Sequence, residues 1–429
     1  MKQFDAVTVV WGREFRELFL DVCMPNQSTP GNLGALPAGS RYRIFTSADD
    51  ATVIEASDVV IRLRQTMPVD LVVVPGLSDG EGSPFARMNA CHQLALDDAA
   101  AAGRGVIVLS PDIFMSEGTL AAAVRRHASG SRAMACSGLR LDRDGFVESL
   151  RSRGGVRALA GRALVALALE HLHSFTRAHM VDAARTPSRP IGVLWNVPAQ
   201  GIVARFFRLH PLLLDPVCRE ARLDSTIDDR YLARACPDLE QVHVVTDSDE
   251  IAVFELSHVD AASTATTPGG VSLWRAVEMI GRCDAHQAAF WTRPIRLHAG
   301  DVDAAWAPVE RHSARFAGRV ARLRRAGMWF YRMSRLLRPL RRRAGKGRQQ
   351  LRDAIKPLSP QRMRRSISRV ASPVRKLTLT AGRSRRLAVR RARRSVTLLV
   401  HSASRPLHAA RKRAARASRR LLGRLRAAH

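Results

Sequence analysis

The chain has 429 residues and a formal net charge of +31, but this charge is unevenly distributed. Residues 1–300 carry 31 Lys and Arg against 34 Asp and Glu, whereas residues 301–429 carry 38 basic residues and only four acids. The length allows two or three domains with a substantial core. The positive charge indicates an anionic partner for residues 301–429 and says nothing about the partners of residues 1–300.

The cysteines and the apolar runs indicate the compartment. The six cysteines (Cys23, Cys91, Cys136, Cys218, Cys236 and Cys283) are widely spaced and form no C-x-x-C motif, so we expect reduced thiols that are mostly buried. No uncharged apolar run reaches the roughly 18 residues that a spanning helix needs. The amino-terminal apolar run is too short and too interrupted for a signal peptide. We therefore expect a cytoplasmic protein.

The first 150 residues alternate short β-rich runs with helical patterns. Strands are expected at residues 4–11, 42–46, 70–76 and 105–109, and helices at residues 13–24 and 85–103. Such alternation predicts a mostly parallel, Rossmann-like α/β sheet with helices on both faces. Functional groups in a sheet of this kind lie at the carboxyl ends of the strands.

The following residues continue the mixed pattern. A strand is expected at 133–141, helices at 148–181, and a pair of strands in QVHVV and IAVFEL. A helical stretch ends near Phe290. We expect residues 1–150 and 151–300 to form two halves of one domain, followed by an arginine-rich segment at 301–429.

The strand GVIVL stops at Ser110-Pro111-Asp112, which places a carboxylate at a strand end. Asp112 could hold a divalent cation that neutralises the phosphates of a ligand. The same three residues also favour a simple turn. Both readings stay open on local grounds.

Two further segments carry candidate site residues. In Thr246-Asp247-Ser248-Asp249-Glu250 three carboxylates repel one another, which a cation would relieve, or the segment is a solvated hairpin turn. In RFFRLHPLLLDP, Arg205 and Arg208 precede His210 and an apolar run. That segment is either a turn whose side chains contact a phosphate or the acceptor, or the start of a strand whose histidine is hydrogen-bonded within the fold.

Taken together, residues 4–300 resemble the nucleotide-sugar glycosyltransferases of the GT-A fold. The expected strand AVTVVWG leads directly into a helix, as does the strand beside which such enzymes bind the nucleobase. The segment ARMNACHQLALDDAAAAGRGVIVLSPD resembles the helix and strand that precede the metal-binding motif of the family. A His-Pro corner and the acidic TDSDE follow later. The family's D-x-D motif appears here as Ser110-Pro111-Asp112, with a single carboxylate.

The resemblance implies sugar transfer from a nucleoside-diphosphate sugar to an envelope or polysaccharide acceptor, either a glycan or a lipid-linked one. It implies Mn²⁺ or Mg²⁺ at Asp112 and Asp247, with help from Glu117 or Asp249, unless the enzyme works without a metal. The expected substrate contacts are Arg205, Arg208, His210 and Asn32, and the expected catalytic bases are Asp228, Asp229 or Asp249.

The basic C-terminal segment has its own candidate partners. Residues 312–340 combine an apolar stripe, including Trp329 and Phe330, with a cationic face, which is typical of a helix lying in an anionic membrane surface. We expect such a protein to be peripheral at the inner face of the membrane. The alternative is a non-enzymatic binding protein whose basic tail engages nucleic acid or another polyanion. Residues 341–429 lack aromatic side chains for base stacking, and their composition alone supports no packed core.

Overall fold

The computed structural model describes residues 1–155, 158–259 and 266–325. All of them belong to one compact unit, Met1–Arg332. The predictions for residues 326–340 of the amphipathic helix, and for 341–429, lie outside the described residues.

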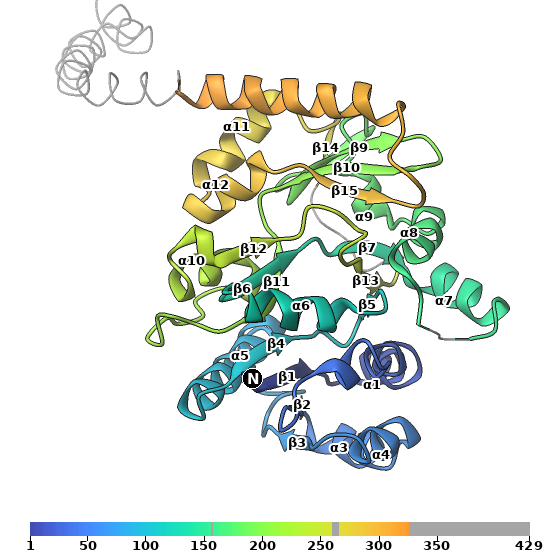
Figure 1. The fold of residues 1–429 in the computed structure, drawn as a ribbon, viewed down its shortest axis with the longest axis vertical. Helices are drawn as coiled ribbons and strands as arrows, with labels where there is room; N and C mark the ends of the chain where they lie inside the picture. Colours follow the sequence, from blue (N-terminus) through green and yellow to red (C-terminus); the bar gives the residue numbers. More distant parts are fainter. Residues whose placement is uncertain (156–157, 260–265, 326–429) are drawn as a thin grey trace, which may run out of the picture. The chain divides into compact units, whose positions relative to one another are not determined.

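A seven-stranded sheet has the strand order β12-β6-β11-β4-β1-β2-β3 and combines five strands of residues 1–150 with two of residues 151–300 (Figure 1). Its strands are β1 (Phe4–Val9), β2 (Arg41–Thr46), β3 (Val69–Val73), β4 (Gly105–Val108), β6 (Ala133–Cys136), β11 (His210–Leu214) and β12 (Val242–Val244). Every strand except β11 runs in the same direction. The predicted mostly parallel α/β sheet is confirmed.

Helices flank this sheet in the order that the alternating pattern predicts. Four short segments join β1 to β2: α1 (Arg13–Leu18), η1 (Phe19–Cys23), α2 (Met24–Gln27) and η2 (Leu33–Ala35). Two helices join β2 to β3, namely α3 (Ala48–Glu55) and α4 (Asp58–Arg64). Helix α6 (Thr119–Ala128) precedes β6. The long α5 (Pro84–Ala101) packs against β1 and β4. It begins where the Ser83 hydroxyl accepts a hydrogen bond from the Ala86 amide, with Pro84 at the first helical position. It ends before Gly103, whose positive φ of 69° suits a helix terminus.

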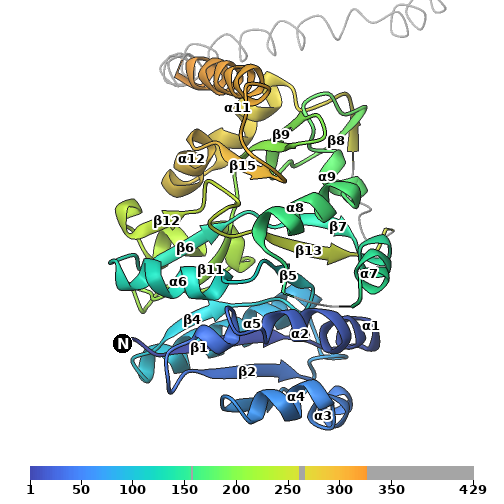
Figure 2. The same cartoon turned by 45° about the vertical axis from the view of Figure 1, so that its right-hand side comes forward.

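A second, three-stranded sheet lies against the first and corrects two strand predictions (Figure 2). It contains β5 (Ile113–Met115), β13 (Val253–Ser257) and β7 (Leu139–Asp142). The predicted strand at 133–141 is in fact β6 and β7, which belong to different sheets. The predicted strand pair around TDSDE is not a hairpin, because β12 belongs to the large sheet and β13 to the small one. Hydrophobic periodicity cannot detect such a change of sheet, because both strands are buried.

A third, antiparallel sheet completes the described strands. Its strands are β9 (Gly192–Val197), β10 (Gly201–Phe206) and β15 (Ile295–His298), and β8 (Arg185–Pro187) pairs separately with β14 (Thr266–Pro268). The helices after β7 are α7 (Arg143–Ser152), α8 (Gly161–Glu170), α9 (Ser174–Arg177), η3 (Ile227–Tyr231), α10 (Leu232–Ala235), η4 (Leu239–Gln241), α11 (Leu273–Arg282) and α12 (Ala285–Thr292). Of these, α8 and α12 contact β10 of the third sheet, α7 and α9 contact β7 of the small sheet, and η3 contacts β11 of the large sheet.

A helix covering residues 306–325, here called the C-terminal helix, packs on this third sheet (Figure 1). Its side chains Trp306, Phe316 and Val320 join a second hydrophobic core with residues of β9, β10, α11 and α12. Within the part of the chain that the structure describes, no helix has both the length and the apolar composition needed to cross a bilayer.

Candidate active site

The topology of the large sheet marks one position where a ligand can bind. From β1 the chain proceeds to β2 and β3 on one side, and it then crosses to β4 on the other side. Sheets of this kind bind ligands in the crevice outside the carboxyl ends of the strands at such a switch point. Ser110-Pro111-Asp112 follows β4 at this point and leads directly into β5 of the small sheet. Asp112 therefore lies at the junction of the two sheets.

Asp112 is held in place on both sides. Its carboxylate accepts a hydrogen bond of 2.5 Å from the Ser110 hydroxyl, and its backbone carbonyl accepts one of 2.8 Å from the amide of Leu256 in β13. Burial raises the pKa of Asp112, although the Ser110 hydrogen bond opposes the shift. Ser110, the residue that replaces the first acid of the family motif, thus orients the remaining one.

Glu255 of β13 is the second acid at this junction. Burial and the nearby charge of Asp112 raise the pKa of Glu255 to about 7. The Arg140 Nε of β7 donates to the Glu255 carboxylate at 3.1 Å. The guanidinium of Arg140 also lies 4.7 Å from the ring centre of Phe175. Its terminal nitrogens have no hydrogen-bond partner among the described residues.

His210 and Asp228 complete the group. His210 begins β11, the one antiparallel strand, so it lies at the same edge as the carboxyl end of β4, and its Nε2 donates to the Val108 carbonyl at 2.9 Å. Burial lowers the pKa of His210, although the charges of Asp228 and Asp112 oppose this. The charge of Asp228, in η3, acts on both His210 and Glu255. We call Asp112, Arg140, His210, Asp228 and Glu255 the Asp112 cluster.

Helix α5 adds two polar groups that have no partner in the structure. The Nδ1 of His92 and the Oδ1 of Asn89 are buried without a hydrogen bond. His92 is 7% exposed, and burial together with the nearby His210 lowers its pKa to about 4. A neutral imidazole with a free nitrogen beside the Asp112 cluster is a group that a ligand could satisfy.

Sequence reasoning found three members of this cluster and missed two. Asp112, His210 and Asp228 were predicted, whereas Arg140 and Glu255 were not. Each of the two missed residues is a single charged residue within an otherwise apolar strand, in GLRL and AVFEL. Charged residues are rarely buried without a partner or a function, so this was the available signal.

The predicted acids Asp247 and Asp249 form a different group. Their carboxylates and the imidazole of His298, at the end of β15, bring ligand-type atoms within 4.8 Å of one another. The His298 Nδ1 donates to the Gly300 carbonyl at 2.6 Å, which leaves Nε2 facing Asp247 Oδ1 at 2.7 Å. This set of one nitrogen and two oxygens could bind a metal.

Cations of the protein already neutralise this second group, which we call the Asp247 cluster (Asp247, Asp249, His298 and Arg162). Arg162 binds both oxygens of Asp249, at 2.9 and 2.8 Å. This contact lowers the pKa of Asp249. Burial lowers the pKa of His298, but its hydrogen bonds to Asp247 and Gly300 outweigh burial and raise it. The two clusters follow different strands of the large sheet, because Asp112 follows β4 whereas Asp247 follows β12 and forms a bridge with Arg296 of the third sheet.

The other predicted residues lie outside both clusters. Arg205 is 5% exposed and donates to the Ser313 hydroxyl at 2.7 Å and to the carbonyls of Trp291 and Thr292, and burial lowers its pKa to about 10. Arg208 and Asp229 pair with each other at 3.1 Å. Arg205 and His210 diverge because β10 and β11 belong to different sheets.

Two more side chains support loops near the start of α6. Asn32 is fully buried and accepts a hydrogen bond from the Leu120 amide. Glu117 accepts one from the Gly31 amide at 2.6 Å. Both side chains are therefore engaged in local structure.

No protein-family model matches the sequence, and no curated protein is significantly similar to it. Among solved structures, the chain is similar to residues 1–349 of S. aureus TarS (13% identity, 32% of this chain and 36% of that chain, TM-score 0.24) and to a longer structure of TarS (10% identity, 67% and 41%, TM-score 0.29). It is also similar to a putative glucose-1-phosphate thymidylyltransferase from Bacillus anthracis in complex with a sucrose (13% identity, 34% and 57%, TM-score 0.23). The chain thus spans between 36% and 57% of those proteins. At these TM-scores the likenesses carry no argument about activity, which depends on the geometry of the site.

Proposed function

We propose that this protein is a glycosyltransferase that moves a sugar from a nucleoside-diphosphate sugar to an envelope or polysaccharide acceptor, with the Asp112 cluster as its active site. The crevice beside β1 and β4 is where a doubly wound sheet binds nucleotides. The cluster combines three acids with an arginine and a histidine at that crevice. These are the groups that a transfer from a diphosphate requires.

The observation that carries this proposal is Glu255. A carboxylate with a pKa of about 7 is divided between its two protonation states near neutral pH, which is the condition for efficient proton transfer. Burial and the charge of Asp112 both disfavour the ionised form of Glu255. The position of this acid therefore lowers the stability of the fold at high pH, and a purely structural role does not explain it. The position of Asp228 makes it the second candidate base.

In the proposed reaction, the ionised Glu255 accepts the proton of an acceptor hydroxyl. The hydroxyl oxygen attacks the anomeric carbon, the bond from that carbon to the diphosphate oxygen breaks, and its electron pair leaves with the diphosphate. The free terminal nitrogens of Arg140 stabilise the negative charge that grows on the leaving group. His210, which donates through Nε2, presents Nδ1 as an acceptor for a sugar or ribose hydroxyl.

A divalent cation fits one of the two predicted positions better than the other. At Asp112 the possible metal ligands are two acids, and Arg140 lies beside them. Arg140 rather than a metal ion would therefore neutralise the diphosphate. At Asp247 the donor set includes Asp249 and His298, and we propose that Mn²⁺ or another divalent cation binds there. A cation at that position would contact no member of the Asp112 cluster and would act on the stability of the loop rather than on the reacting atoms.

The acceptor has a candidate position between α1 and α7. A cleft of about 560 Å³ lies between α1 and α7, and α7 begins three residues after Arg140. Its lining includes Glu14, Glu17, Asp21, Asp144 and Glu148 against three arginines. Excess carboxylates suit the hydroxyl groups of a glycan and disfavour a diphosphate.

The experiment compares the full chain with its Glu255→Gln variant. Isothermal titration with UDP- and GDP-sugars measures donor binding, and release of the nucleoside diphosphate measures turnover with a set of glycan and lipid-linked acceptors. We expect binding to persist and turnover to fall by about 10²- to 10⁴-fold, because the base is lost while the shape of the site is kept.

Glu240→Gln is the matched control, because Glu240 in η4 is an exposed acid that forms no ion pair among the described residues and lies at the opposite edge of the large sheet, before β12. It is expected to leave turnover unchanged. A chain that binds no nucleotide sugar contradicts the proposal and favours the alternative of a non-enzymatic scaffold. Turnover that survives Glu255→Gln but not Asp228→Asn would transfer the role of base to Asp228.

A further inference from the structure

The C-terminal helix has two opposite faces, and one of them is fully used by the fold. Its buried residues are Trp306, Ser313, Phe316 and Val320. At 3.6 residues per turn these positions fall within an arc of about 80°. The Ser313 hydroxyl accepts from Arg205, and Glu310 pairs with Arg296 at 2.6 Å. These contacts fix the rotation of the helix relative to the third sheet.

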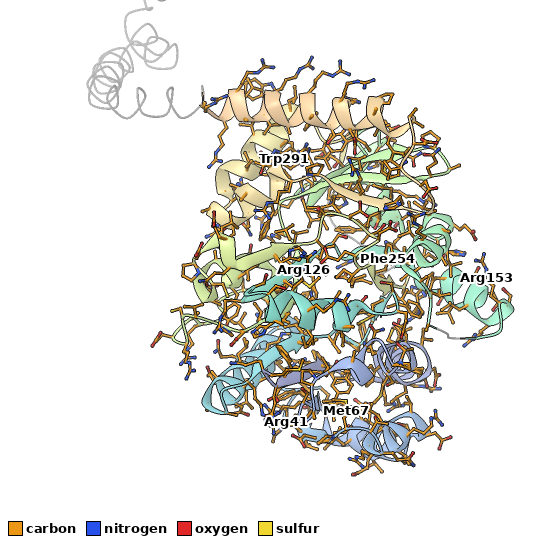
Figure 3. All side chains as sticks on the ribbon, viewed as in Figure 1. Arg41, Met67, Arg126, Arg153, Phe254 and Trp291 are labelled. Atoms are coloured by element: carbon orange, nitrogen blue, oxygen red, sulfur yellow. The ribbon has the colours of Figure 1, made fainter. Side chains whose placement is uncertain are left out.

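The opposite face carries a row of arginines. Arg311, Arg315, Arg319 and Arg322 are all exposed, and we call them the arginine face. Their positions also fall within an arc of about 80°, centred opposite the buried residues, and they span about 16 Å along the axis. Figure 3 shows side chains with nitrogen tips projecting from the outer side of this helix.

Within residues 1–155, 158–259 and 266–325, no carboxylate neutralises the arginine face. The acids of residues 301–325 are engaged elsewhere: Asp301 with Arg162, Asp303 with Gln200, and Glu310 with Arg296. Among the described residues, none of the four arginines takes part in an ion pair. The face is therefore a fixed row of four positive charges.

This geometry changes the expected mode of membrane binding. The sequence predicted a helix over residues 312–340 that inserts its apolar stripe into a membrane. Over residues 312–325 the apolar side chains Phe316 and Val320 instead belong to the second core. This part of the helix can meet a charged surface only through its arginines, without insertion.

We propose that the arginine face docks on the headgroups of an anionic phospholipid bilayer. A guanidinium matches a phosphate with two parallel hydrogen bonds, and basic residues near an anionic membrane each strengthen binding by about fivefold. Because one packed helix carries all four arginines, they can engage a flat surface together, and binding orders only their side chains and not the backbone. This inference goes beyond the proposed transfer reaction and does not depend on it.

The composition of the face favours lipid over nucleic acid. Between the arginines lie the small residues Ala314, Gly318 and Ala321, and the helix exposes no aromatic side chain for stacking on bases. On α11, which packs against the same helix, Trp274 is 73% exposed. An exposed indole is typical of proteins that contact a membrane–water interface.

The test is co-sedimentation of the full chain with phosphatidylcholine vesicles that do or do not contain phosphatidylglycerol, at physiological ionic strength. The test variant carries Arg311→Gln, Arg315→Gln, Arg319→Gln and Arg322→Gln. The matched control carries Arg411→Gln, Arg413→Gln, Arg419→Gln and Arg420→Gln, which removes the same charge from the basic segment outside the described residues. We expect the test variant to lose about 100-fold or more in affinity for the anionic vesicles, and the control to lose much less.

A variant with lysine at the same four positions guards against misfolding, because it keeps the charge and should retain most of the binding. Equal losses in the test and control variants would overturn the proposal, since net charge alone would then explain binding. Loss of duplex DNA binding without loss of vesicle binding would also overturn it and would identify nucleic acid as the partner.

Discussion

Two groups of acids lie at the same edge of the large sheet, and their electrostatic environments are opposite. In the Asp112 cluster, burial raises the pKa of both Asp112 and Glu255, the charge of Asp112 raises that of Glu255 further, and one arginine contacts Glu255. In the Asp247 cluster, Arg162 covers both oxygens of Asp249, and the raised pKa of His298 accompanies its contact with Asp247. In the first group, Asp112 has no ion pair with an arginine or lysine among the described residues. In the second group, Arg162 pairs with Asp249 and His298 contacts Asp247.

This difference shows why the number of acids is a poor guide to chemistry. TDSDE has three carboxylates within four residues and looked the stronger acidic site, yet its acids are held by partners of the fold. SPD has one carboxylate, and the fold supplies a second one from β13. Proton transfer needs a group whose two protonation states are close in free energy, and only the first cluster provides it.

The largest expected contrast is in turnover. We expect Asp112→Asn to lower transfer by about tenfold, because burial then raises the pKa of Glu255 without the added charge of Asp112 and the base is weaker. Asp249→Asn, the same change in the other cluster, should alter the rate only a few-fold. Release of the nucleoside diphosphate measures both. Similar losses in the two variants would show that both clusters serve one reaction.

A second contrast concerns metal binding. Zn²⁺ or Mn²⁺ is expected to raise the melting temperature of the full chain, with about 2.7 kcal/mol of stabilisation at a free metal concentration 100 times the Kd. His298→Ala should abolish this effect, because it removes the only nitrogen ligand of the Asp247 cluster. Asp112→Asn should leave it intact. A melting temperature that does not respond to either metal would mean that the His298–Asp247 ion pair occupies the site.

The smallest expected effect is a pH dependence of stability. The pKa of Glu255 is about 7 in the folded chain against an ordinary value of 4.5, so its contribution to stability is present below 4.5 and is lost as the pH rises through 7. Glutamine does not titrate. The free energy of unfolding of Glu255→Gln, relative to the unchanged chain, should therefore increase between about pH 5 and about pH 8. Urea unfolding measures it, and a constant difference across this range would contradict the raised pKa.

The strands and helices of the first half were readable because their signals are local. β1, β2, β4 and α5 were each predicted within a few residues, since buried strands are short apolar runs and α5 has Ser83 and Pro84 at its start. The breaks at 137–138 and between β12 and β13 were not readable. A chain that passes from one sheet to another keeps its apolar pattern, so nothing in that pattern marks the crossing.

The candidate sites divide in the same way. The sequence alone determined that residues 1–300 are a nearly neutral α/β body, that Asp112 follows a buried strand, and that arginine dominates the C-terminal segment. Only the tertiary structure decided that Glu255, far along the chain, reaches Asp112, and that Asp247 and Asp249 face His298 instead. It also turned the apolar side of residues 312–325 inward and left the arginines outside. The physical reason is that pKa values and ion pairs depend on distance and burial, and both are set by which strands become neighbours.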